Sequence, residues 1–368
     1  MLPCIRPDLA EFAAYSAHSA DSLDVEPESV DILDTNECAH DLPASLKDKL
    51  GFAYQQEIAS NRYPDGGHGV LKDAIARYVN ESAHLTAITP ANISVGNGSD
   101  ELIRSLLIAT CVGRPGAILV AEPTFSMYGI LADTLGIPVV RVPRDEATFA
   151  VNIEVAQAAI ATSEQPVRVV FMVHPNSPTA NALTDTELTW LQQLPTDTLV
   201  VIDEAYFEFS QQTTVANLLT KPNWVVTRTF SKAFRLAAHR VGYSIASPEI
   251  TQVLEKVRLP YNLPSLSYRA AQISLAHYPD LMAVVDEVKA ERDRLYAAMT
   301  QLPNLRVWPS DANFFYSRPT DREPANLFQA LRRLGTNVRH TGGGLRITIG
   351  TPEENQRTLD HLQQVLGE

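Results

Sequence analysis

Cysteine is scarce in this 368-residue sequence, and its pattern supports neither a disulfide framework nor a metal site. Cys4, Cys38 and Cys111 are widely separated, no C-x-x-C pair occurs, and the nine histidines are dispersed without an H-E-x-x-H motif. We therefore expect no metal and no disulfide scaffold. So few cysteines suit a reducing compartment. Together with the polar start MLPCIRPDLAEF, they predict a cytoplasmic protein.

Long apolar runs and an excess of basic residues are also missing. No stretch reaches the roughly 18 uninterrupted apolar residues that a membrane-spanning helix needs, so we expect no membrane contact. The 43 acidic side chains outnumber the 30 basic ones, for a formal net charge of −13. This balance argues against a nucleic-acid partner. An anionic small molecule must then be held by a local group of arginines.

The glycine motifs of nucleotide-binding proteins are incomplete. The stretch SVGNGSDELIRSLL predicts a strand, a turn and a helix, but Glu101 stands where the dinucleotide fingerprint has its third glycine. This failed fingerprint excludes a nicotinamide dehydrogenase, and no G-x-x-x-x-G-K-[ST] motif occurs either. The stretch still places the backbone N–H groups of Gly98, Ser99 and Asp100 at a helix N-terminus, where phosphate binds.

The middle of the chain alternates short β-branched runs with helical patterns. Several of the runs are apolar almost throughout, as expected for strands covered on both faces. We predict an α/β fold in which a large domain has a mainly parallel sheet flanked by helices, with the ligand beyond the C-terminal ends of the strands. The predicted strands are 116–123, 138–143, 167–173, 199–205, 224–230 and 241–247, and the predicted helices are 126–136, 152–161 and 184–194.

The pattern changes after about residue 255. A long amphipathic helix over roughly 280–302 is followed by the short strands FFYSR and GLRITIG and by two further helices. We predict a large cofactor-binding domain over 36–255 and a smaller α+β domain over 256–368. Residues 1–35 have weak periodicity and predict an N-terminal arm that lies over the body or over a partner.

One lysine stands among three arginines in the stretch TRTFSKAFRLAAHRVGYSIA. Ser231 and Lys232 directly follow a predicted strand, and Arg240 comes eight residues later. A patch for an anion needs no particular lysine, whereas a covalent catalyst does. Taken alone, however, a Ser–Lys pair after a strand is an ordinary loop.

Three further motifs follow predicted strands. VIDEAYFEF puts Asp203 at a strand end, where burial of an acid is costly without a positive partner, and Tyr206 follows one turn on. EPTFSMYG offers Phe125 and Tyr128, one of which could lie flat on a planar ring. HPNSPTA is a polar turn that could bring an amide to a ligand oxygen. A helix cap, a core aromatic and a plain turn are the respective alternatives.

One ligand explains these motifs together. Its phosphate needs the helix N-terminus, Ser231 and Arg240, and its protonated ring nitrogen needs Asp203. Its phenolic oxygen needs Tyr206 and a turn amide, its ring face needs an aromatic side chain, and its aldehyde needs Lys232. That ligand is pyridoxal 5′-phosphate, which we predict as the cofactor.

With these residues placed, the chain resembles the fold-type-I pyridoxal-phosphate aminotransferases, most closely the histidinol-phosphate aminotransferase family. The resemblance rests on LDTNE, NRYPDG, GNGSDE, EPTFSMY, PNSPT, DEAYFEF, SKAFRLA-x-x-R and LRITIG in that order. It implies transamination between L-histidinol phosphate and 2-oxoglutarate, giving imidazole-acetol phosphate and glutamate, in histidine biosynthesis. The alternatives are a broader (aromatic) amino-acid aminotransferase or a pyridoxal-phosphate-dependent decarboxylase on the same fold. A regulatory module without turnover is disfavoured because no basic DNA-binding segment is present.

The resemblance also implies roles for individual residues. Lys232 would form the imine with the cofactor, Asp203 would pair with the ring nitrogen, and Tyr206 would contact the phenolic oxygen. Tyr63 would reach the phosphate from a neighbouring subunit, which makes the expected active form a homodimer. The remaining implied cofactor contacts are Gly98, Ser99, Asp100, Tyr128 (stacked on the ring), Asn176, Ser231 and Arg240, and the implied substrate contacts are Arg339, Arg346, Tyr15 and Asn36.

The two arginines suit a phosphate-bearing substrate. One guanidinium clamps a carboxylate through two hydrogen bonds, whereas a phosphate has a third oxygen and more charge. Arg346 in GLRITIG matches the anion-binding arginine of the family, and Arg339 lies across a glycine turn from it. We therefore expect both to converge on the substrate anion.

The sequence departs from the family pattern in two motifs. Ser177 stands directly before proline where the family has a functional Asn, so Asn176 is the candidate substitute, and Ala180 replaces a glycine of the same turn. Arg235 and Ala238 replace two glycines of the lysine loop. Arg235 either supports the phosphate or points to solvent, and we expect solvent.

Overall fold

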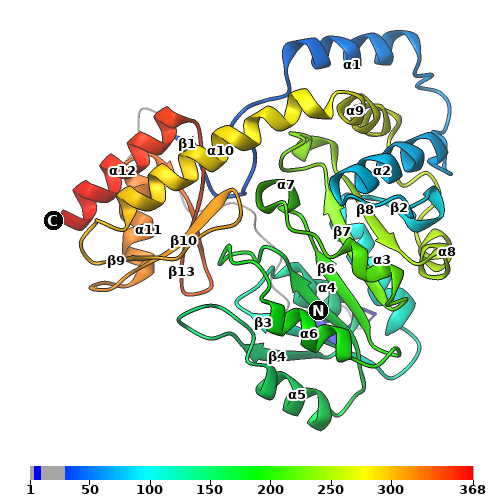
Figure 1. Cartoon of the computed structure of the whole chain (residues 1–368), viewed down its shortest axis with the longest axis horizontal. Helices are drawn as coiled ribbons and strands as arrows, with labels where there is room; N and C mark the ends of the chain where they lie inside the picture. Colours follow the sequence, from blue (N-terminus) through cyan, green and yellow to red (C-terminus); the bar gives the residue numbers. More distant parts are fainter. Residues whose placement is uncertain (1–3, 10–29, 368) are drawn as a thin grey trace.

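The computed structural model describes residues 4–9 and 30–367 (Figure 1). Most of the expected N-terminal arm, including Tyr15, therefore lies outside the described residues. In the described part of the chain, no helix is long and apolar enough to cross a membrane.

The largest of the three sheets in the described residues has seven strands in the order β2-β8-β7-β6-β5-β3-β4. Strand β8 runs antiparallel to both of its neighbours, and the other neighbouring strands are parallel. The mainly parallel sheet is thus confirmed, and so are all six strands expected in this region. The bounds of the seven strands are β2 (Ile93–Asn97), β3 (Ala117–Glu122), β4 (Val139–Pro143), β5 (Val167–Val173), β6 (Leu199–Asp203), β7 (Trp224–Thr229) and β8 (Val241–Ala246).

Both faces of this sheet are covered, which is why its strands are apolar at successive positions. On β5, Val169 and Phe171 belong to one buried cluster, whereas Val170 and Met172 belong to another. The three helices expected between the strands are present, and α6 begins with the expected capping box of Thr184. The surrounding helices are α1 (Ala44–Gln56), α2 (Gly69–Ser82), α3 (Gly98–Thr110), α4 (Met127–Leu135), α5 (Ile153–Thr162), α6 (Asp185–Gln193), α7 (Phe207–Ser210), α8 (Pro248–Val257) and α9 (Ser265–Ala276).

The C-terminal part of the chain builds a second, antiparallel sheet in the order β12-β13-β10-β9. Helix α10 extends from α9, beside the large sheet, to this smaller sheet (Figure 1). The bounds are α10 (Tyr278–Met299), β9 (Leu305–Val307), β10 (Phe314–Pro319), α11 (Pro324–Arg333), β12 (Arg339–Thr341), β13 (Gly344–Thr348) and α12 (Pro352–Gly367).

The segment before α1 lies against the smaller sheet. Strand β1 (Asp31–Ile32) pairs in parallel with β11 (Thr336–Asn337), and the backbone N–H of Asn36 donates to Thr348 Oγ1 at 3.0 Å. Val201 of the large sheet and Phe314 of the small one belong to the same buried cluster. Residues 31–36 are thereby held beside the C-terminal ends of the large sheet.

Candidate active site

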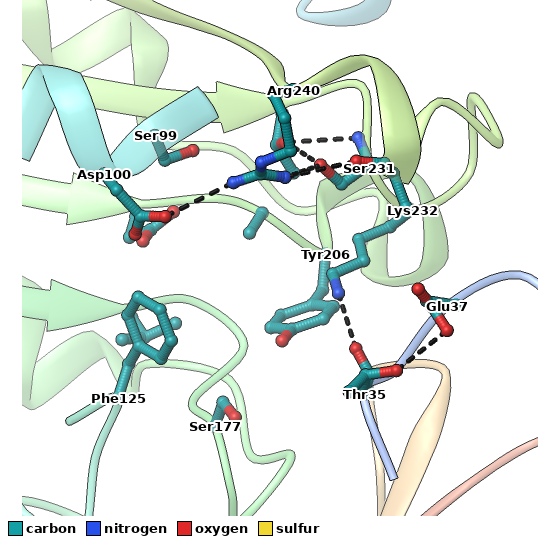
Figure 2. A pocket seen from close by; sticks show the side chains of 15 residues that line it. Thr35, Glu37, Ser99, Asp100, Phe125, Ser177, Tyr206, Ser231, Lys232 and Arg240 are labelled. Atoms are coloured by element: carbon teal, nitrogen blue, oxygen red, sulfur yellow. Dashed lines mark hydrogen bonds and ion pairs between the residues drawn. The ribbon is translucent and has the colours of Figure 1, made fainter. Parts of the chain in front are cut away.

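A cavity of about 240 Å³ lies at the C-terminal ends of the parallel strands (Figure 2). Its lining comes from the residues that follow β2, β3, β5, β6 and β7, because parallel strands end at one edge of the sheet. The segment 35–37 lines it from the other side. Seven of the predicted site residues lie in this lining: Ser99, Asp100, Asp203, Tyr206, Ser231, Lys232 and Arg240.

Lys232 is placed for amine chemistry. Its loop follows β7, next to β6, whose last residue is Asp203. The Lys232 Nζ donates to the backbone oxygen of Thr35 at 2.8 Å. Burial lowers the pKa of Lys232 to about 7, and the nearby guanidinium of Arg346 acts in the same direction. A substantial fraction of this amine is therefore neutral at physiological pH, as a nucleophile or a proton carrier requires.

Asp203 is a buried carboxylate with one oxygen available for a ligand. Tyr128 donates its hydroxyl to Asp203 Oδ2 at 2.8 Å. Oδ1 is buried and has no hydrogen-bond partner among the described residues. Burial raises the pKa of Asp203 to about 6, and the hydrogen bond from Tyr128 opposes this rise. Such a carboxylate is stabilised by a cationic N–H group of a ligand.

The opposite end of the cavity is suited to an anion. Helix α3 begins at Gly98, so its first backbone N–H groups point into this end. Arg240 donates to Ser231 Oγ at 3.2 Å and to Asp100 at 3.3 Å. The buried Ser99 Oγ has no partner within the described chain. Gly98 has φ +73°, and a Cβ there would lie 2.6 Å from Arg240 Nη2, so this position requires glycine.

The structure corrects the expected stacking residue. Phe125, in the loop between β3 and α4, lines the cavity. Tyr128, in the first turn of α4, is buried, stacks on Phe171 at 4.6 Å between ring centroids, and supports Asp203. The aromatic wall of the cavity is therefore Phe125 rather than Tyr128.

In the polar turn after β5, Asn176 does not take the place of the family's functional Asn, contrary to the expectation from the sequence. Ser177 lines the cavity and accepts a hydrogen bond from Arg346 at 3.0 Å. Asn176 is buried behind the lining, where its Nδ2 donates to Pro123 O and its Oδ1 accepts from Thr124 Oγ1, each at 3.0 Å. Asn176 therefore holds the turn against the Phe125 loop instead of facing a ligand.

Asn36 likewise lies behind the lining. It is fully buried and donates from Nδ2 to the Tyr206 hydroxyl at 3.0 Å. The expected direct contact of Asn36 with a substrate is thus replaced by a contact with Tyr206. Burial raises the pKa of Tyr206, so the hydroxyl remains a hydrogen-bond donor at neutral pH.

Two arginines lie on one face of the smaller sheet. Arg339 and Arg346 are directly opposite each other in the antiparallel pair of β12 and β13, and opposite residues share a face. Arg346 also donates to the backbone oxygen of Asp34 at 2.5 Å. These contacts place Arg346 beside the cavity at Ser177.

Tyr63 and Arg235 lie away from this cavity. The Tyr63 side chain is 81% exposed and stacks on Tyr261, with 4.6 Å between ring centroids. Arg235 donates to the backbone oxygens of Asp41 and Leu281, at 3.1 and 3.4 Å. The expectation that Arg235 points to solvent is therefore wrong.

Sequence reasoning missed three polar residues of the lining: Thr35, Glu37 and Thr229. Thr229 Oγ1 donates to Ser231 Oγ at 2.9 Å. Thr35 and Glu37 belong to the motif LDTNE, which therefore already contained a signal for them. Their distance in sequence from the other motifs gave no indication that they would lie next to Lys232.

Comparison with known proteins decides the family. The family model described as aminotransferase class I and II matches residues 31–362. The chain is an aminotransferase of class I and II.

In the residues that the structure describes, no group of three or more His, Cys, Asp or Glu side chains could hold a metal ion.

Relatives of this aminotransferase extend over its whole length. A Nostoc sp. protein named histidinol-phosphate aminotransferase 2 is 58% identical over 100% of this chain and 98% of its own. A histidinol-phosphate aminotransferase of Trichodesmium erythraeum is 56% identical over 99% of this chain and 100% of its own.

Solved structures share the fold. Histidinol-phosphate aminotransferase from Sinorhizobium meliloti in complex with pyridoxal-5′-phosphate superposes with a TM-score of 0.83, at 22% identity over 100% of this chain and 98% of that one. The L-threonine-O-3-phosphate decarboxylase of Porphyromonas gingivalis gives 0.75, at 20% identity over 91% and 99% of the two chains. The expected α/β fold of type-I aminotransferases is confirmed.

Proposed function

We propose that this aminotransferase uses pyridoxal 5′-phosphate to transfer the amino group of L-histidinol phosphate to 2-oxoglutarate, as a step of histidine biosynthesis. The full-length identity of 58% to a histidinol-phosphate aminotransferase is the observation that carries the substrate. The homodimer and the cytoplasmic location stay predictions.

The donor set of the cavity fits this cofactor. The partnerless Oδ1 of Asp203 suits a protonated ring nitrogen, and the partnerless Oγ of Ser99, with Arg240 and the α3 N-terminus, suits a phosphate. Phe125 would cover the ring face, and Tyr206 would contact the phenolic oxygen. When bound, the cofactor supplies an electron-withdrawing ring that stabilises negative charge on the substrate carbon.

Lys232 has two functions in this proposal. Its amine would hold the cofactor, and once free it would act as the base that takes a proton from the substrate carbon and then as the acid that delivers this proton to the cofactor. Both functions require a neutral amine, which a pKa of about 7 provides. Asp203 keeps the ring nitrogen protonated through its negative charge.

Arg346 and Arg339 support a phosphate monoester as the substrate anion. Arg346 is shared, in the proposal, by the carboxylate of glutamate and the phosphate of histidinol phosphate. Arg339, opposite it in register, adds contacts that a carboxylate does not need.

The proposal is tested with the purified, cofactor-loaded enzyme. Addition of histidinol phosphate should convert the visible spectrum to that of the amine form, and 2-oxoglutarate should restore it. Release of carbon dioxide from an added α-amino acid, without a need for an oxo acid, would instead identify a decarboxylase.

The arginine roles are tested by two variants in the same assay. Arg346→Ala should impair both half-reactions by roughly 30-fold or more, the usual loss for a charge-assisted contact. Arg339→Ala should impair the histidinol-phosphate half-reaction distinctly more than the glutamate one. Equal losses on both substrates would favour a general amino-acid aminotransferase.

A further inference from the structure

Four consecutive residues, Asp34 to Glu37, lie beside the site, and two of them, Thr35 and Glu37, line the cavity. The backbone oxygen of Asp34 accepts from Arg346 at 2.5 Å, and that of Thr35 accepts from Lys232 at 2.8 Å. Asn36 donates to the hydroxyl of Tyr206. Each of these three residues thus holds a site side chain. Glu37, the fourth, has its own side chain in the cavity lining.

The carboxylate of Glu37 differs from the other two carboxylates of the lining. Asp100 is paired with Arg240 at 3.3 Å, and Asp203 faces the position proposed for the ring nitrogen. Glu37 accepts a hydrogen bond from Thr35 Oγ1 at 2.8 Å, and within the described residues it forms no ion pair. It is exposed at the mouth of the cavity, on the side of Lys232 and Thr35 and across from Phe125 and Asp100 (Figure 2).

An unpaired carboxylate repels the anions that this site is proposed to bind. Within the protein, Glu37 interacts favourably with Lys232, whose pKa it acts to raise. A bound substrate offsets the remaining repulsion if it carries a cationic or N–H-bearing group at the same place. Histidinol phosphate has three polar groups: a phosphate, an amine and an imidazole ring. The phosphate is assigned to Arg346 and Arg339, and the amine is assigned to the Lys232 position. The imidazole has no partner in this assignment.

We propose that Glu37 is a specificity-determining residue that accepts a hydrogen bond from the imidazole ring of the substrate. This inference rests on the proposed function. The geometry supports it because Thr35 contacts both residues. Its backbone oxygen accepts from Lys232, and its hydroxyl donates to Glu37, so a single residue links the carboxylate to the place of the amine. The imidazole and the amine of histidinol phosphate are themselves attached close together, to neighbouring carbons. A carboxylate at this position also favours the protonated ring.

The experiment compares two amine donors with the cofactor-loaded enzyme and Glu37→Gln. Phenylalaninol phosphate carries the same amine and phosphate as histidinol phosphate but has a phenyl ring without N–H groups. Glu37→Gln should lower kcat/KM for histidinol phosphate by about 10-fold or more, and that for phenylalaninol phosphate by less than about threefold. Glu164→Gln, which removes an exposed charge elsewhere, is the matched control and should change neither value.

The pH dependence provides a second measurement. The preference of the wild-type enzyme for histidinol phosphate should increase as the pH falls through the ordinary imidazole pKa of about 6.5, and Glu37→Gln should remove that increase. Equal losses on both donors would show that Glu37 acts through Lys232 and would overturn the inference. Failure of the wild-type enzyme to convert histidinol phosphate at all would overturn the proposed function as well.

Discussion

Replacement of Tyr128 by Phe tests how the site keeps Asp203 ionised. The Tyr128 hydroxyl donates to Asp203 Oδ2 at 2.8 Å, and both side chains are buried. The pKa of Tyr128 is raised well above its ordinary value by burial and by Asp203, so the hydroxyl remains a donor throughout the working pH range. The same contact opposes the burial that raises the pKa of Asp203 to about 6.

The size of the effect follows from this hydrogen bond. A hydrogen bond to a charged group contributes about 1.5–3 kcal/mol, and about 1.4 kcal/mol corresponds to one pKa unit. Tyr128→Phe should therefore raise the pKa of Asp203 from about 6 to roughly 7–8. At pH 7, the ionised fraction would fall from about nine-tenths to about half or less. The aromatic ring remains, so the stacking on Phe171 is preserved.

The assay is the affinity of the cofactor-free protein for pyridoxal 5′-phosphate as a function of pH, because the pKa of about 6 belongs to the empty site. The acid limb of this affinity should move up by about one to two pH units, so the affinity near pH 6 falls by roughly 10-fold or more and recovers near pH 8.5. Phe171→Leu disturbs the same stack without touching the hydrogen bond, and its acid limb should stay in place. An unshifted limb in Tyr128→Phe would show that other contacts keep Asp203 ionised, and would refute this reasoning.

Three further predictions concern the lysine, the subunit interface and acid stability. Borohydride reduction of the cofactor-loaded protein should attach the cofactor to the peptide of Lys232, and attachment at the exposed Lys256 would contradict the assignment. Mixing inactive Tyr63→Ala and Lys232→Ala variants should restore activity through hybrid dimers, and no recovery after proven subunit exchange would argue against a shared site. Burial lowers the pKa of His68 to about 4, so the unfolded chain binds a proton that the folded chain does not as the pH falls from 6.5 towards 4. The free energy of unfolding should therefore fall by up to about 3 kcal/mol over this range. His68→Asn, which tolerates the φ of 55°, should flatten this dependence in urea titrations, and an unchanged slope would exclude His68 as its source.

The sequence by itself determined the sheet and the main chemistry of the site. The apolar runs predict strands because burial on both faces leaves no polar alternation, and β5 shows this with its two clusters. Asp203 ends β6 and Lys232 comes shortly after the adjacent parallel strand β7, so the topology alone brings them to the same edge. Strand order and parallel pairing are enough to assemble these residues because the backbone carries them there.

Only the tertiary structure decided which of several neighbouring side chains faces the ligand. Phe125 and Tyr128 are three residues apart, and the start of α4 at Met127 leaves the first in the loop and turns the second towards Asp203. In the polar turn after β5, the side chain of Asn176 points away from the cavity. Its Oδ1 is held by Thr124, a residue 52 positions earlier in the chain.

Glu37 shows the same dependence on distant contacts. Its place beside Lys232 arises because Thr35 accepts from a lysine 197 residues further along the chain, and because β1, at the start of this segment, pairs with β11. Local propensity carries no information about such pairings. The direction of an individual side chain is determined by hydrogen bonds and packing between segments that meet only in the folded protein, so it could not be derived from the motif in which the residue occurs.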